Sequence, residues 1–160
     1  GQQPTAKQQD EFVKTRLEFI KASKEGVNDF SLKLRELVDL KSLSYKQENQ
    51  THIELTFDVY IEKLGDDAKG KLDGFLTYNK QQQFIDFIEV TNNSDFSPMF
   101  SASISDFKMN MKFQKLTDAI LPLENSMEMK GTFAFFTEIN ETSNDHFSQF
   151  LYHGKTNSGQ

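Results

Sequence analysis

Strict alternation of apolar and polar residues between positions 53 and 61 constrains this chain more than any other feature. The apolar side chains in this run are Ile53, Leu55, Phe57, Val59 and Ile61, and mainly polar side chains separate them. Successive side chains of a β-strand point to opposite faces of a sheet, so the pattern is typical of a strand with one buried face. The pattern predicts a fold, and it indicates no reaction.

Similar alternating runs extend along the rest of the chain. They predict a hairpin from residues 43–45 and 51–63, and further strands over 71–78, 83–91, 100–113, 127–139 and 147–152. The parity of the apolar positions switches near Asp106, which predicts a bend there. A short helical turn is expected over 115–121, ended by Pro122.

The first part of the chain has helical spacing instead. Apolar residues between positions 8 and 25 predict an amphipathic helix that Gly26 ends, and residues 28–38 fit a second helix better than a strand. We therefore expect an α+β fold: one or two N-terminal amphipathic helices, then an antiparallel β-meander of six or seven strands in a curved sheet or half-barrel. This single domain would span 8–153, between a polar N-terminal tether at 1–7 and a flexible tail at 154–160.

Composition limits the functions that fit such a domain. The formal net charge of −6 disfavours binding to a phosphate backbone, so nucleic acid is not an expected partner. No apolar run has the length that a transmembrane helix needs, and the absence of Cys excludes a disulfide-stapled scaffold. Gly1 and the polar residues after it read as a tether exposed by removal of an upstream segment, so an exported periplasmic or envelope protein is expected, and a lipoprotein would fit.

Methionine pairs are the most unusual motif. Met109 and Met111 alternate within one expected strand, and Met127 and Met129 within another, so each pair lies on one face. If the strands were neighbours, the thioethers could converge on Cu(I). Methionine is more often an adaptable core residue, and together with Phe it also suits the lining of a site for an apolar ligand. The candidate ligand-binding residues are Phe107, Met109, Met111, Phe113, Met127, Met129, Phe133 and Phe135.

Catalytic motifs are missing. The histidines are widely separated and have no metal-ligand spacing, so we predict no catalytic set, no metal site and no cofactor. His52 shares a strand face with Glu54 and Asp58, which could provide acid–base chemistry, although antiparallel sheets commonly keep one such face in water.

The sequence thus favours a non-enzymatic exported binding or assembly module that holds an apolar small molecule or a protein segment. One alternative is a small cavity-containing enzyme of helix-plus-sheet type that uses His52 with a carboxylate. The other is a Cu(I)-binding protein that uses the two Met-x-Met pairs.

Overall fold

The computed structural model describes residues 37–99, 101–117, 119–134, 136–148 and 150. The expected helix over 8–25, the tether at 1–7 and the tail at 154–160 lie outside these residues, as does most of the expected second helix. Leu37 and Val38 are the described part of that second helix, and both are buried. The described fold is mostly β.

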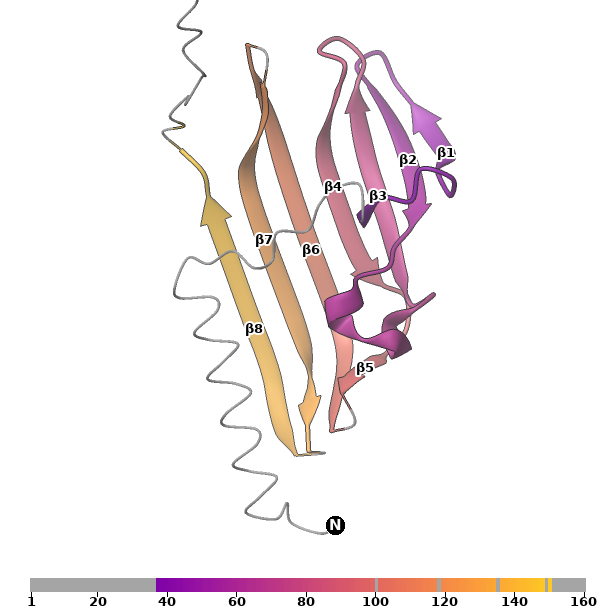
Figure 1. Cartoon of the computed structure of the whole chain (residues 1–160), viewed down its shortest axis with the longest axis vertical. Coiled ribbons are helices and arrows are strands. Elements are labelled where there is room, and N and C mark those ends of the chain that lie inside the picture. The colour runs from indigo at the N-terminus through magenta and orange to yellow at the C-terminus, as the bar shows by residue number, and fades with distance from the viewer. Residues whose placement is uncertain (1–36, 100, 118, 135, 149, 151–160) are drawn as a thin grey trace, which may run out of the picture.

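Eight strands form one antiparallel sheet (Figure 1). They are β1 (Ser44–Glu48), β2 (His52–Asp58), β3 (Leu72–Asn79), β4 (Phe84–Asn92), β5 (Phe96–Met99), β6 (Ala102–Leu116), β7 (Ala119–Phe133) and β8 (Thr137–His146). Their order is β1-β2-β3-β4-β6-β7-β8, and β5 pairs with the first residues of β6. The sheet is open, because β1 and β8 each pair with only one described strand. The predicted antiparallel meander is confirmed, with eight strands instead of six or seven.

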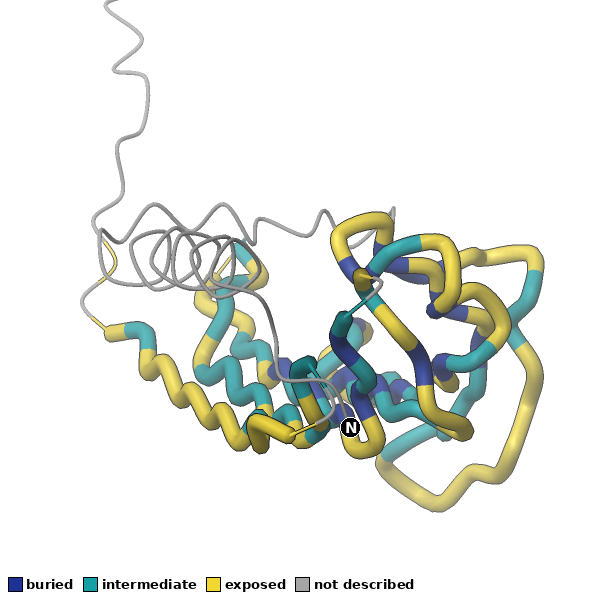
Figure 2. Tube along the Cα trace, turned by 90° about the horizontal axis from the view of Figure 1, so that it is seen from below, coloured by how far each residue is buried: buried dark blue, intermediate teal, exposed yellow. Residues whose placement is uncertain are grey.

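The hydrophobic core lies on one face of the sheet. Cross-strand pairing builds it in rows, and one row runs from Leu55 through Leu76 and Ile88 to Met111. The chain after β2 covers this face with two single-turn 3-10 helices, η1 (Glu62–Leu64) and η2 (Asp66–Ala68), which bury Leu64 and Ala68 (Figure 1). Buried residues therefore concentrate on the β2–β6 side of the sheet, whereas the described β8 is mostly exposed (Figure 2).

The strand predicted over 51–63 is wrong in its second half. β2 ends at Asp58, although Val59 and Ile61 continue the apolar alternation and are buried. These two residues belong to the segment that covers the core face, and an extended covering segment buries every second side chain just as a strand does. Periodicity alone could not separate the two cases.

The helical turn predicted over 115–121 is also wrong. Lys115 and Leu116 end β6, Ala119 begins β7, and Leu116 pairs with Ala119 across a tight turn. Thr117 takes a φ of 51° in that turn. Pro122 does not end the structure; it lies within β7 opposite Phe113, at an irregularity of the ladder where a missing N–H is tolerated.

The last two predicted strands are wrong as well. The run 127–139 is divided between two strands, because β7 ends at Phe133 and β8 begins at Thr137. In the predicted strand 147–152, the described residues Phe147, Ser148 and Phe150 are not in a strand, and the others lie outside the described residues. The edge strand at this end of the sheet is β8. Its residues are exposed except for the half-buried Ile139, so its sequence lacks the apolar alternation by which a strand is recognised.

The bend predicted near Asp106 is confirmed. The β6–β7 register shifts between Ile104 and Asp106, as a β-bulge does. Gly131 pairs with Ile104 at this bulge, and a β-carbon on Gly131 would collide with the carbonyl oxygen of Ser103. The bulge restores apolar parity, so that Ile104 and Phe107 are both buried.

Candidate functional site

The methionine pairs lie on neighbouring strands and on the same face of the sheet. Met109 of β6 pairs directly with Met127 of β7, and Phe107 pairs with Met129. Met111 is one diagonal step from Met127, so the thioethers form one contiguous group. We call the group formed by Phe107, Met109, Met111, Phe113, Met127 and Met129 the Met/Phe face.

Burial divides the Met/Phe face between its two strands. On β6, Phe107, Met109 and Met111 are only 1%, 5% and 7% exposed and belong to the hydrophobic core. On β7, Met127 and Met129 are half-buried and pack against that core, as Phe113 does. Residues of the β6 side therefore stabilise the fold, and any ligand would contact mainly the β7 side.

The structure does not bring the other two predicted site residues into this group: one lies elsewhere on β7, and the other is not described. Phe133 is half-buried at the far end of β7, where it pairs with Ala102. Phe135 lies outside the described residues.

A polar group missed by sequence reasoning adjoins the Met/Phe face. Asn125 pairs with Met111 and therefore lies on the same face. Its Oδ1 atom is buried and accepts no hydrogen bond. An unsatisfied buried acceptor costs about 1–3 kcal/mol, and buried polar groups normally have a partner. Asn125 thus supplies an acceptor at the edge of the Met/Phe face. The β8 residues paired with Asn125, Met127 and Met129 on this face are polar as well: Asp145, Ser143 and Glu141.

His52 lies on the face of the sheet opposite the Met/Phe face. Its carboxylate partner is Asp86, and not Glu54 or Asp58 as the sequence suggests. Its Nε2 atom is 2.7 Å from Oδ2 of Asp86, and its Nδ1 atom is 2.8 Å from the Thr51 hydroxyl. The Thr77 hydroxyl donates to the other oxygen of Asp86. This network joins β2 to β4 across β3.

Neither expected partner of His52 forms this hydrogen bond. Glu54 accepts one from the Gln47 side-chain amide instead, and Asp58 lies at the other end of β2. The enzyme alternative would therefore use Asp86. Asp86 stands 34 positions from His52, and only the registers of β2, β3 and β4 bring them together.

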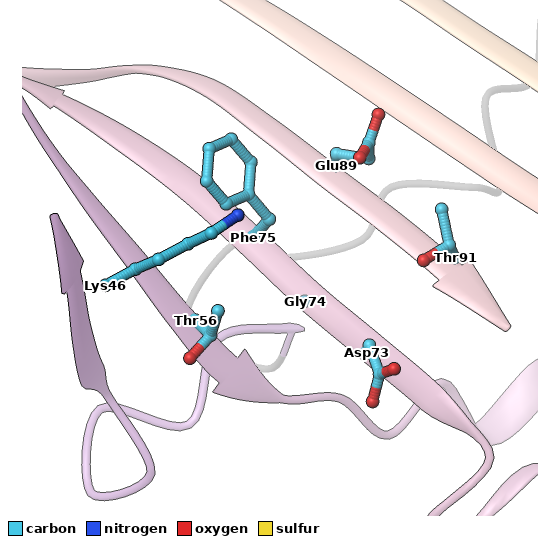
Figure 3. Close-up of a pocket in the computed structure, with 7 residues that line it drawn as sticks. All are labelled: Lys46, Thr56, Asp73, Gly74, Phe75, Glu89 and Thr91. Atoms are coloured by element: carbon cyan, nitrogen blue, oxygen red, sulfur yellow. The ribbon is translucent and has the colours of Figure 1, made fainter. Parts of the chain in front are cut away.

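A shallow open cleft of about 200 Å³ occupies the same polar face (Figure 3). Its lining comes from four adjacent strands: Lys46, Thr56, Asp73, Gly74, Phe75, Glu89 and Thr91. His52 does not line it. No motif marks these residues in the sequence. Gly74 belongs to the core face and Lys46 lies at an irregularity of β1, and the others are ordinary outward-facing positions of their strands.

Charges around the cleft are partly paired. Glu89 lies 2.8 Å from the Lys108 ammonium, and its hydrogen bond and charge raise the pKa of Lys108. Asp73 accepts a hydrogen bond from the Asn93 amide at 3.0 Å. The Lys46 ammonium lies 4.8 Å from the centre of the Phe75 ring (Figure 3).

The part of the chain that the structure describes contains no group of three or more His, Cys, Asp or Glu side chains that could hold a metal ion. Within the same residues, no helix is long and apolar enough to cross a membrane.

Comparison with known proteins adds no assignment. No family model matches the sequence, and neither a curated protein nor a solved structure matches it.

Proposed function

We propose that this chain is a non-enzymatic binding or assembly module of the cell envelope that holds an apolar small molecule or a partner segment against its Met/Phe face. The observation that carries the proposal is the direct pairing of Met109 with Met127. It joins a buried thioether to a half-buried one. Flexible, polarisable thioethers adapt to ligands of different shape, and the core behind them supplies a rigid support. A curved, half-barrel form of the sheet is part of this proposal.

Asn125 supports a ligand that is apolar but carries one hydrogen-bond donor. Sites for small molecules are mostly apolar, with a few polar groups that orient the ligand. The unpartnered Oδ1 of Asn125 beside Met111 could accept such a bond. An amphipathic molecule with a hydroxyl or amide N–H fits this description better than a pure hydrocarbon does.

Native mass spectrometry of the purified chain, compared with its denatured mass, is the first test. We expect an excess of several hundred daltons that is released on unfolding. Met127→Gln should remove this excess while the chain still unfolds cooperatively, because Met127 is only half-buried. Ile120→Gln is the matched control on β7; Ile120 is 52% exposed and lies near the β6–β7 turn, so its variant should keep the ligand. Equal native and denatured masses, or retention by Met127→Gln, would contradict an apolar ligand site.

A protein segment as the occupant needs a separate test. The chain would carry a crosslinking group at position 127, or at position 120 as the control, and would be crosslinked in the cells of its own host. After purification, we expect one defined partner to be attached at position 127 and none at position 120. Fractionation of the same cells tests the envelope location. Capture of the same proteins from both positions, or a chain found only in the cytoplasmic fraction, would overturn these parts of the proposal.

A Cu(I) site is the second candidate, and the position of the thioethers favours it. Met109 and Met127 are cross-strand neighbours on one face of the sheet. Met111 and Met129 lie two residues further along β6 and β7 on the same face. Soft thioether ligands select Cu(I). Titration with Cu(I) under anaerobic conditions should give stoichiometric binding that a Met109→Leu/Met111→Leu double variant loses. Unchanged binding by that variant would exclude the site.

A further inference from the structure

An irregularity in edge strand β1 changes the direction of one lysine. The β1–β2 register shifts between Tyr45 and Gln47, so Gln47, and not Lys46, stands opposite Glu54. The Gln47 amide accordingly donates to Glu54 at 2.8 Å. Bulges commonly redirect a side chain, and here the bulge deprives Lys46 of the carboxylate that a regular ladder would have placed opposite it.

Lys46 reaches over β2 to an aromatic ring instead. Its ammonium lies 4.8 Å from the centre of the Phe75 ring, inside the cleft lined by residues of β1–β4 (Figure 3). An ammonium ion within about 6 Å of an aromatic face is attracted by the quadrupole of the ring. The face of the Phe75 ring therefore attracts a positive charge.

The other residues that line the cleft also favour an ammonium ion. Two carboxylates, Asp73 and Glu89, supply negative charge, and the hydroxyls of Thr56 and Thr91 supply acceptors. The Lys108 ammonium, from outside the lining, compensates the charge of Glu89 at 2.8 Å, so Asp73 is the main source of negative charge in the cleft. An aromatic ring with carboxylates and hydroxyls around an open space matches the needs of an alkylammonium ion.

We propose that this cleft is a binding site for small alkylammonium ions and that Lys46 is its internal occupant. Lys46 is exposed on an edge strand, and its attraction to the half-buried Phe75 ring is worth only about 0.5–1 kcal/mol at such a solvent-accessible site. An external ammonium can therefore displace it. The proposal concerns the face opposite the Met/Phe face and does not depend on an apolar ligand.

The experiment is an NMR titration of the folded chain with propylammonium chloride, following the ring signals of Phe75. Lys46→Met keeps the apolar stem but removes the competing charge. We expect this variant to bind propylammonium roughly three- to sixfold more tightly than the unmodified chain, because apparent affinity rises with the fraction of sites that are open. Binding by Lys46→Met no tighter than by the unmodified chain would overturn the role of Lys46 as occupant.

Four controls distinguish a site from general charge attraction. Phe75→Leu in the Lys46→Met background should lose most of the binding, and Phe75→Tyr, which keeps the ring, should retain it. Phe87→Leu is the matched aromatic control, since Phe87 packs edge-on at 6.4 Å from Phe75 but does not line the cleft. The neutral probe 1-propanol should not bind. Equal binding of 1-propanol, or full binding by Phe75→Leu, would overturn the proposal.

Discussion

The ring of Phe57 occupies the space beside Gly74 that a β-carbon at position 74 would fill. The two residues pair directly across β2 and β3, on the face that carries the core. Phe57 is 4% exposed, so its ring has no solvent side into which it could move. The glycine is therefore needed for space, and not for an unusual backbone conformation.

Gly74→Ala should lower the free energy of unfolding by about 1–3 kcal/mol, the usual cost of overpacking a core. A smaller side chain at position 57 would relieve the overlap. Gly74→Ala combined with Phe57→Leu should therefore be more stable than the sum of the two single effects predicts, with a coupling of at least about 0.5 kcal/mol. Urea denaturation of the four proteins measures this coupling. Strict additivity would show that the ring does not need the space.

Gly131 meets a different obstacle, because the atoms beside it belong to the backbone. A β-carbon there would collide with the carbonyl oxygen of Ser103 at the bulge of β6. Gly131→Ala should cost about 3 kcal/mol, since backbone cannot move aside as a side chain can. Gly70→Ala is a useful control: its β-carbon would have open space, and only its φ of 70° opposes the change. Equal losses for both variants in urea denaturation would contradict the proposed collision.

Thr117 is strained in the turn between β6 and β7. A φ of 51° is unfavourable for a β-branched residue, and glycine adopts it without a steric penalty. Thr117→Gly should raise the free energy of unfolding by about 0.5–1 kcal/mol, because relief of strain exceeds the extra entropy of the unfolded chain. The same change at Thr142, in the exposed strand β8, should lower it by a similar amount. A destabilised Thr117→Gly protein in thermal unfolding would contradict the strain.

The same turn explains where sequence reasoning fails. Hairpin turns are recognised by Gly or Asn at positions of positive φ, and Thr117 and Ala134 occupy such positions instead. Neither hairpin of the β6–β8 region was therefore predicted. The strands β2 to β4 are predicted because residues such as Leu55 and Leu76 alternate with polar residues along each strand.

The candidate sites were predictable to different degrees. Alternation places Met109 and Met111 on one face of their strand, but only the observed register shows Met127 opposite Met109. The pairing of His52 with Asp86 and the cleft around Phe75 depend on the order of β1 to β4. Sequence patterns report the face of a single strand, and contacts between strands need the topology.

Asp67 gives the fold a defined response to acid. Its carboxylate accepts hydrogen bonds from the backbone N–H of Ser97 at 2.7 Å and from the Lys71 ammonium at 3.0 Å, and so fastens η2 to β5. These two hydrogen bonds, first that from Ser97, hold the pKa of Asp67 below its ordinary value. A pKa that folding lowers contributes stability above the unfolded pKa of about 4, and that contribution is lost as the pH falls through the folded value.

Asp67→Asn should therefore be less stable than the unmodified chain at pH 6 to 7, and the difference should shrink as the pH falls below about 4. Urea midpoints measured from neutral to strongly acidic pH would show two curves that converge. Asp95→Asn removes a charge from the exposed loop just before β5 and serves as the control, with no comparable convergence expected. A gap between unmodified and Asp67→Asn curves that stays constant with pH would mean that the link to Ser97 does not depend on the charge of Asp67.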